Sequence, residues 1–182
     1  MAKNETLLDL LLEVQSLDRV PRAGYILRGI PDAESVSEHS WHLAFLVWIL
    51  ADSEPTVDAS RAIPMALLHD VAEVRFGDIP RTAARYLGEG VKGQAESRAM
   101  KEILAPLGDR SQELFDEYRR GESPEARFVK ACDKLQLMIK ISAYEGWGAK
   151  GLDEFWNNAG DRPGEEFDSV AKVFAGLLER RG

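Results

Sequence analysis

Residues 63–74 read IPMALLHDVAEV, an apolar segment that carries His69, Asp70 and Glu73. Apolar residues on nearly every side are typical of a helix in the interior of a protein. An ionised carboxylate in that setting needs a partner, because its burial without one is very costly. A bound cation would satisfy it, and salt bridges are the competing explanation. The segment therefore predicts a buried helix that carries a polar site.

Two further apolar segments carry residues of the same kinds. His39 precedes LAFLVWIL (43–50), and Asp133 lies inside FVKACDKLQLMIKI (128–141). One divalent metal ion would satisfy Asp70 and Asp133 together, and two neutral imidazoles would complete a shell of nitrogen and oxygen donors. We therefore expect the three segments to be central helices that meet at a metal site.

The N-terminal part of the chain shows helix start signals. Asn4 would cap a helix over LLDLLLEVQSL (7–17), after which Pro and Gly residues break the chain into a loop. Ser35 and Glu38 form a capping box, in which each side chain bonds the backbone of the other residue. This box places His39 in the first turn of the second helix.

The pattern continues to the end of the chain. Asp58 would cap a third helix, with Pro64 tolerable only in its opening turns and Gly77 as its stop. A short helix would start near Asp78 and run to about 87, followed by a mobile LGEGVKG connection. Further helical patterns cover 94–107, 111–120, 124–144 and 165–180. No segment alternates with period two, so we predict an all-α, compact multi-helix bundle.

Composition bounds the function. A chain of 182 residues with 45% hydrophobic content, and without a Ser/Pro-rich linker, predicts a single domain over 1–182. The net charge of -8 argues against binding a nucleic-acid polymer, which needs clustered Lys and Arg. Cys132 is the only cysteine, the N-terminus fits no signal peptide, and no apolar run reaches the roughly 20 residues of a membrane span. We expect a cytoplasmic protein without a membrane partner.

The spacing of the third segment suggests hydrolysis. On a helix that turns about 100° per residue, His69 and Glu73 share a face and Asp70 lies about 60° from Glu73. A carboxylate one turn from a metal ligand is where a general acid or base belongs. The alternative for Glu73 is a pair with Arg75 or Arg81 on a solvated turn.

The ordered set His39, His69-Asp70 and Asp133 resembles the H…HD…D pattern of the HD-domain phosphohydrolases. The wider strings SVSEHS (35–40), LLHDVAEVRFGDIP (67–80) and DKLQ (133–136) look like the branch of small HD-domain 5′-deoxynucleotidases, which remove phosphate from deoxynucleoside 5′-monophosphates. The resemblance covers roughly residues 7–160, and its motifs are the most specific part.

The resemblance implies four metal ligands, namely His39, His69, Asp70 and Asp133. It also implies that Glu73 is the catalytic carboxylate and that Asp78 is a second acidic group near the substrate. Asp78 has an alternative as a helix cap before Ile79.

Substrate contacts are expected from the first loop. Arg22 and Tyr25 fall where this branch holds an Arg and an aromatic residue, usually Trp, that contact phosphate and sugar. Arg28 is a possible substitute for Arg22, and Arg81 is a further basic candidate for phosphate. His42, one turn after His39, either touches substrate or packs at the edge of the pocket.

With only three histidines, the chain lacks the extra ligands of two-metal HD proteins, so we expect one divalent metal per chain. The donor set suits Mn²⁺, Co²⁺, Fe²⁺ or Ni²⁺ better than Zn²⁺ or Mg²⁺. The resulting hypothesis is a phosphomonoesterase that acts on a small-molecule nucleotide, the (deoxy)nucleoside 5′-monophosphate. The alternatives are a phosphodiesterase or nucleotide pyrophosphohydrolase, and a non-catalytic helical dimerisation or regulatory module. Apolar faces on the first and last helices predict a homodimer under each of them.

Overall fold

The computed structural model describes residues 6–181, and these residues form helices and connecting turns without a strand. The only β-type contact in this part of the chain is an isolated bridge between Pro21 and Ser35. The predicted all-α class is therefore confirmed. The α-helices are α1 (Leu7–Val14), α2 (Ala23–Ile26), α3 (Val36–Ala51), α4 (Ala59–Leu68), α5 (Arg81–Ala84), α6 (Val91–Ile103), α7 (Asp109–Arg120), α8 (Pro124–Gly146), α9 (Asp153–Asn157) and α10 (Asp168–Arg181). Short 3₁₀ turns cover Gln15–Arg19, Val71–Val74, Ala105–Leu107 and Ala159–Asp161.

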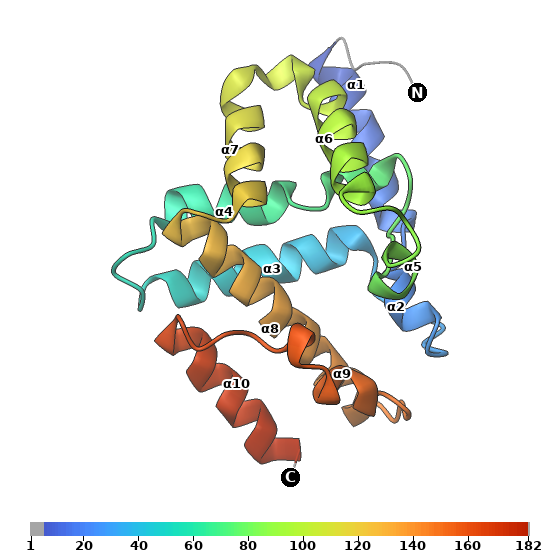
Figure 1. Cartoon of the computed structure of the whole chain (residues 1–182), viewed down its shortest axis with the longest axis vertical. Coiled ribbons are helices and arrows are strands. Elements are labelled where there is room, and N and C mark those ends of the chain that lie inside the picture. The colour runs from blue at the N-terminus through green and yellow to red at the C-terminus, as the bar shows by residue number, and fades with distance from the viewer. Residues whose placement is uncertain (1–5, 182) are drawn as a thin grey trace.

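The centre of the molecule is built from α3, α4 and α8. The long α8 crosses α3 diagonally, α10 packs along α8, and α6 and α7 lie at the opposite end beside α1 (Figure 1). The main core joins the three central helices through fully buried side chains, among them Leu43, Val47, Met65, Phe128 and Leu135. Each such side chain contributes roughly 1.5–3 kcal/mol through its removal from water. This core holds rigid the elements that carry the expected metal ligands.

The caps of the N-terminal helices follow the sequence in part. Asn4 lies outside the described residues, and Thr6 caps α1 in a capping box with Asp9. The helix also ends at Val14, earlier than expected, and continues as a 3₁₀ turn. The second predicted capping box is confirmed, because Ser35 accepts from the backbone of Glu38 and Glu38 Oε2 accepts from the backbone of Ser35 at 2.7 Å.

The third helix begins as predicted but differs in the position of its proline and in where it ends. Asp58 caps it as expected and accepts from the Ser60 N–H at 2.8 Å. Pro64, however, lies inside α4 rather than in its opening turns, and the helix ends at Leu68 instead of reaching Gly77. Asp70 leaves helical geometry with φ -112° and ψ 11°, and a 3₁₀ turn follows it. The continuous helix that we expected through Glu73 is therefore wrong.

The region after Gly77 is also rearranged. The predicted short helix near Asp78 is limited to α5, and Gly90, at φ +73°, precedes a helix that begins at Val91. Part of the expected mobile connection LGEGVKG is thus the first turn of α6. Left-handed backbone of this kind favours glycine, which has no Cβ to clash.

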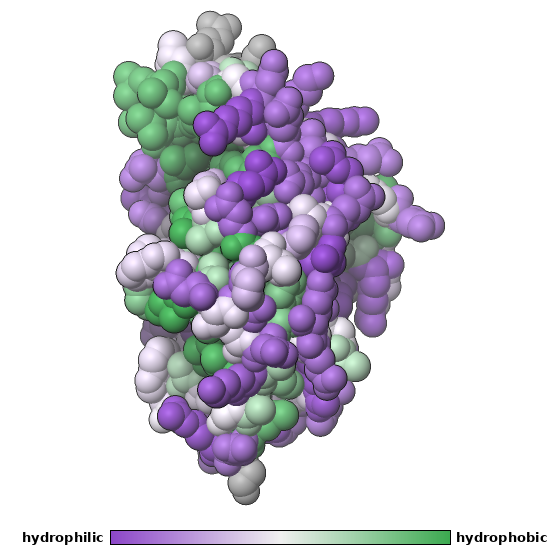
Figure 2. All heavy atoms as spheres, turned by 90° about the vertical axis from the view of Figure 1, so that its left-hand side faces the viewer, coloured by the Kyte–Doolittle hydropathy of each residue, from purple (hydrophilic) through white to green (hydrophobic). Residues whose placement is uncertain are grey.

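No helix in the described part of the chain is long and apolar enough to cross a membrane. Hydrophilic side chains cover most of the face shown in Figure 2, whereas hydrophobic ones gather near its top, beside the grey residues. The exposed apolar side chains of α1 belong to this end of the molecule, namely Leu7, Leu8, Leu11 and Leu12.

Candidate metal centre and its cavity

Four side chains from three parts of the chain lie close together. His39 comes from the first turn of α3, His69 and Asp70 follow the last residue of α4, and Asp133 lies on α8. His39 Nε2 lies 3.2 Å from His69 Nε2 and 3.2 Å from Asp133 Oδ1. Asp70 Oδ2 lies 3.0 Å from His69 Nε2 and 3.9 Å from His39 Nε2. The structure groups the ligand atoms of His39, His69 and Asp70 closely enough to hold one metal ion, and it places Asp133 beside this group through His39.

The break at the end of α4 makes this arrangement possible. On a continuous helix, adjacent residues point about 100° apart, so His69 and Asp70 would face different directions. Because the chain leaves the helix at Asp70, the imidazole and the carboxylate reach the same point. Glu73 lies in the 3₁₀ turn and not on the helical face that we expected, although Asp70 and Glu73 do line one cavity.

The hydrogen-bond partners of the two histidines leave one nitrogen of each ring available to bind a cation. His69 Nδ1 lies 2.7 Å from the carbonyl oxygen of Ala66, and His39 Nδ1 lies 2.8 Å from Gln136 Oε1. Both oxygens accept hydrogen bonds, so each Nδ1 carries the hydrogen and each Nε2 is left with a lone pair. Two buried imidazole lone pairs thus face two carboxylates that line the cavity. A divalent transition metal satisfies all four donors at once.

A proton is the competitor of the cation. Burial disfavours the charged form of His69, but Asp70 outweighs burial and raises the pKa of this imidazole. Burial likewise opposes ionisation of Asp70, yet His69 and Arg22 hold the pKa of the carboxyl well below its usual range. Asp133 behaves in the same way beside His39, with a lowered pKa. Both carboxyls are therefore ionised at neutral pH.

The salt-bridge explanation holds for only part of the site. Arg22 Nη1 lies 2.9 Å from Asp70 Oδ2, so this carboxylate has a cationic partner from the first loop. Asp133 instead faces His39, whose Nε2 is directed to the other donors by its tautomer. A pair with Arg22 leaves the two imidazoles and Asp133 unexplained, whereas a metal ion accounts for all of them.

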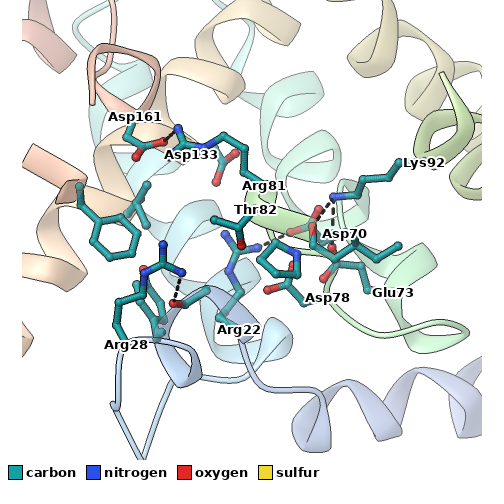
Figure 3. Close-up of a pocket in the computed structure, with 16 residues that line it drawn as sticks. Arg22, Arg28, Asp70, Glu73, Asp78, Arg81, Thr82, Lys92, Asp133 and Asp161 are labelled. Atoms are coloured by element: carbon teal, nitrogen blue, oxygen red, sulfur yellow. Dashed lines mark hydrogen bonds and ion pairs between the residues drawn. The ribbon is translucent and has the colours of Figure 1, made fainter. Parts of the chain in front are cut away.

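A cavity of about 260 Å³ opens beside the four donors. Its charged lining residues are shown in Figure 3: Arg22, Arg28, Asp70, Glu73, Asp78, Arg81, Lys92, Asp133 and Asp161. Asp70, Glu73 and Lys92 gather on one side, and the pair of Arg81 with Asp161 lies on the other (Figure 3). The aromatic rings of Tyr25 and Phe155 and the side chain of Leu137 add apolar surface. Such a mixture suits a small anionic ligand with an apolar portion.

Glu73 is buried, with 2% of its surface exposed, and it lines this cavity. Burial and the neighbouring Asp70 and Asp78 raise the pKa of Glu73 to about 10. Its Oε1 lies 3.9 Å from Lys92 Nζ, and its Oε2 is buried without a hydrogen-bond partner. An unpaired oxygen in a cavity wall is available to a ligand.

The alternative that we considered for Glu73 is wrong. Arg75 bonds Glu13 at 2.8 Å, and Arg81 bonds Asp161 at 2.7 Å. The cation near Glu73 is Lys92, which also lies 3.6 Å from Glu96. Glu73 therefore faces the cavity rather than a solvated turn.

Asp78 has a structural task that the sequence did not reveal. Its Oδ2 accepts from the backbone N–H of Ala23 at 2.7 Å, which ties the loop of Arg22 to the cavity wall. Pro80, not Asp78, is the N-cap of α5, so the expected cap before Ile79 is wrong. Asp78 nevertheless lines the cavity, as the predicted second acidic group should.

The remaining predicted contacts divide into two groups. Tyr25, Arg28 and Arg81 line the cavity, and the Tyr25 hydroxyl is buried without a partner. Arg28 pairs with Glu154, and the Arg81 pair is described above. His42 is not a lining residue: its ring is 40% exposed and its Nδ1 lies 3.5 Å from Glu34 Oε2. The structure supports neither of our two interpretations of His42, contact with substrate or packing at the edge of the pocket, because this residue lies outside the cavity lining.

Two buried polar residues behind the ligands escaped the sequence reasoning. Gln136 bonds His39, and Glu34 accepts from Gln136 Nε2 at 3.2 Å. The DKLQ string contained Gln136, three residues after Asp133 and so on nearly the same helical face, which is a signal that could have identified it. Glu34 carries no comparable signal, because it lies in a loop before a capping box.

Comparison with known proteins agrees with this geometry. The model of the HD domain family matches residues 14–170. The human protein 5′-deoxynucleotidase HDDC2 is 37% identical over 144 residues, which are 77% of this chain and 69% of the human one. The Schizosaccharomyces pombe protein 5′-deoxynucleotidase hdd1 is 32% identical and covers 85% of this chain and 81% of its own length.

A solved structure is similar over almost the whole chain. A conserved hypothetical protein from Pyrococcus furiosus superimposes with a TM-score of 0.81 at 34% identity, over 95% of this chain and 99% of that chain. The arrangement of helices described above is therefore shared beyond the ligand residues.

Proposed function

Because the chain belongs to the HD-domain family, and within it to the group of the 5′-deoxynucleotidases, we propose that it is a metal-dependent phosphomonoesterase that converts deoxynucleoside 5′-monophosphates to nucleoside and phosphate. The observation that carries this proposal is the group of His39, His69 and Asp70, with Asp133 beside His39, at the inner end of a cavity with cationic side chains. Two imidazole lone pairs that face each other repel, so a bound cation explains why His39 Nε2 and His69 Nε2 lie 3.2 Å apart.

We assign the metal to His39, His69, Asp70 and Asp133, one ion per chain. A divalent transition metal held there would supply positive charge to a phosphate oxygen and make water more acidic. The donor set favours Mn²⁺, Co²⁺, Fe²⁺ or Ni²⁺ over Mg²⁺ and Zn²⁺.

The cavity walls would position the phosphate. Arg22 already reaches the inner end through Asp70, and its planar guanidinium can bind two phosphate oxygens. Lys92 stands opposite, beside Glu73, as a second positive charge. Arg28 and Arg81 bind Glu154 and Asp161, which are not among the proposed metal ligands, so we place these two arginines at the mouth rather than on the phosphate.

Glu73 would carry the proton. A carboxyl whose pKa is raised to about 10 holds its hydrogen at neutral pH, and in the cavity it can give that hydrogen to the leaving nucleoside oxygen. Once its hydrogen has passed to the leaving oxygen, the Glu73 carboxylate can accept a hydrogen from the water that attacks the phosphate. Tyr25 lines the cavity with a buried hydroxyl that has no hydrogen-bond partner, so we propose that it contacts the sugar of the substrate.

A phosphate-release screen tests the proposal. Purified protein is supplied with Mn²⁺ or Co²⁺ and each ribo- and deoxynucleoside 5′-monophosphate, and inorganic phosphate is measured. We expect release from the deoxynucleotides and its loss with EDTA. Activity restricted to cyclic dinucleotides or nucleoside diphosphates would instead favour the phosphodiesterase or pyrophosphohydrolase reading, and stable metal-free protein without activity would favour a regulatory module.

We also propose a single domain over the chain, a cytoplasmic location and a homodimer. Support for dimerisation comes from exposed apolar side chains on α1 and on α3, where Trp41, Phe45 and Trp48 are 58%, 44% and 56% exposed. Light scattering coupled to gel filtration would give the mass in solution, and a monomer at micromolar concentration would contradict the dimer.

A further inference from the structure

A buried carboxylate lies behind the metal centre, away from the cavity. The side chain of Glu34 is 1% exposed, and Glu34 does not line the cavity. Burial of a carboxylate is costly unless it is bonded and balanced. Glu34 has both kinds of partner, because Lys140 Nζ lies 3.0 Å from its Oε2 and Gln136 Nε2 lies 3.2 Å from the same oxygen. The reaction assigned to the cavity gives this residue no task.

The chemistry of Glu34 decides how Gln136 is oriented. A carboxylate oxygen only accepts, so the amide of Gln136 must turn its NH₂ group to Glu34. Its oxygen is then directed to His39 Nδ1, 2.8 Å away. The hydrogen of His39 is thereby kept on Nδ1, and the lone pair is kept on Nε2, which faces the other metal ligands.

A reversed amide would have the opposite effect. The NH₂ group of Gln136 would then donate to His39 Nδ1, and the ring hydrogen would move to Nε2. That nitrogen could no longer bind a metal ion. The buried acid therefore selects the form of the histidine that binds.

The other ligand histidine is oriented by a different device. His69 Nδ1 bonds the backbone carbonyl of Ala66 at 2.7 Å, and a carbonyl of the helix cannot reverse its polarity. His39 depends instead on two side chains in series. A substitution can therefore change the form of His39 while it leaves the form of His69 in place.

The chain holds this network from several sides. Gln136, Lys140 and Tyr144 recur every four residues along α8, which places them on one face of the helix. The Tyr144 hydroxyl accepts from the Glu34 N–H at 2.8 Å, and the Glu34 carbonyl accepts from the Arg22 N–H at 2.9 Å. The position of Glu34 is thus defined through its backbone as well as its carboxylate.

We propose that Glu34 and Gln136 are positioning residues that fix the tautomer of His39 and so set the affinity of the chain for its metal ion. The proposal rests on the metal site of the proposed function. It adds an energetic role for two residues that touch neither metal nor substrate. Partners of this kind typically change metal affinity by about 10- to 100-fold when they are removed.

The experiment compares four variants with the wild type. Gln136→Leu removes the acceptor, and Glu34→Gln removes the group that orients the amide. The exchange Glu34→Gln with Gln136→Glu returns a carboxylate beside His39 Nδ1 and an amide that can donate to it. Glu54→Gln is the matched control, because Glu54 is a buried acid, 8% exposed, that accepts from the Ser169 N–H at 2.8 Å instead of serving the metal site.

Two readouts are used, and neither is turnover. Mn²⁺ is titrated into each protein and the free ion is followed by electron paramagnetic resonance, and ¹⁵N spectra of the imidazoles report the tautomer of His39 in the metal-free protein. We expect Gln136→Leu to bind Mn²⁺ about 10- to 100-fold more weakly, Glu34→Gln to fall between it and the wild type, and the exchanged pair to recover most of the affinity. The Glu54→Gln control should match the wild type in both measurements.

The proposal is overturned if Gln136→Leu binds Mn²⁺ as the wild type does, or if its affinity falls while His39 keeps the hydrogen on Nδ1. It is also overturned if the exchanged pair binds no better than Gln136→Leu. These outcomes are independent of the substrate: a wild type that binds Mn²⁺ but releases no phosphate would contradict the proposed function and leave the affinity comparison valid.

Discussion

The inner end of the cavity and its mouth use the same residue types in different ways. At the inner end, Asp70 and Asp133 face two buried imidazoles and Glu73 is itself buried, and each acid is explained by a cation, an imidazole or a retained proton. At the mouth, Arg28 pairs with Glu154 and Arg81 pairs with Asp161, and each pair includes one side chain that is more than half exposed. Buried charges without partners cost several kcal/mol, whereas exposed pairs contribute about 0–1 kcal/mol. Substitutions should therefore act strongly at one end and weakly at the other.

The largest effect is expected from loss of a ligand. Asp70→Asn keeps the shape of the side chain and removes its charge, so the metal should be lost together with its stabilisation of the reacting phosphate. Since each 1.36 kcal/mol is tenfold in rate, turnover should fall by more than about 10⁴-fold. Phosphate release and bound metal, by plasma mass spectrometry, are measured together. Asp58→Asn, at the other end of α4, is the control and should retain both.

A smaller effect is expected where the proton is handled. Glu73→Gln should keep the metal, because Glu73 is not one of the four donors, and should lower turnover by about 10²- to 10⁴-fold. Glu96→Gln is the matched control, since Glu96 also lies near Lys92, at 3.6 Å, but does not line the cavity. Full activity of Glu73→Gln would show that Glu73 transfers no proton in the reaction. The inner end would then act only through the charges of its metal site.

The same residue predicts how stability depends on pH. Burial, with Asp70 and Asp78, raises the pKa of Glu73 to about 10, whereas an unfolded chain loses this proton near the usual value of about 4.3. Between these values the folded state binds more protons, so the metal-free protein loses stability as pH rises. Glu73→Gln removes this loss and should raise the melting temperature at pH 8 by at least about 2–4 °C, for 1 kcal/mol or more. Calorimetry in EDTA at pH 5 and pH 8 measures it, and the gain should be smaller at pH 5.

The inner end was largely predictable from the sequence. An apolar helix that carries His or Asp has few stable explanations, so the convergence of His39, His69, Asp70 and Asp133 followed from the pattern and its order. The break after Leu68 did not follow, because no glycine marks it and Pro64 lies too early to cause it. Contacts in the folded protein bring the side chains of His69 and Asp70 together, and a regular helix would not allow this.

The mouth was not predictable, because its contacts join distant parts of the chain. Arg28 and Glu154 are 126 residues apart, and Arg81 and Asp161 are 80 apart. No local spacing links them, so the sequence marked both arginines as phosphate ligands without showing that acids already face them. His42 failed for a related reason: helical spacing places it near His39, but its ring points toward Glu34 and solvent.

The smallest effects should separate the two possible uses of Arg28. If it only closes the mouth through Glu154, both Arg28→Ala and Glu154→Gln should change KM less than about threefold and unfolding free energy by at most about 1 kcal/mol. If Arg28 binds substrate, Arg28→Ala raises KM, whereas Glu154→Gln frees the guanidinium and lowers KM. Steady-state kinetics on one deoxynucleotide, with urea unfolding of both variants, distinguishes these results. Because opposite signs are expected only for substrate contact, the pair of variants decides whether the mouth takes part in binding.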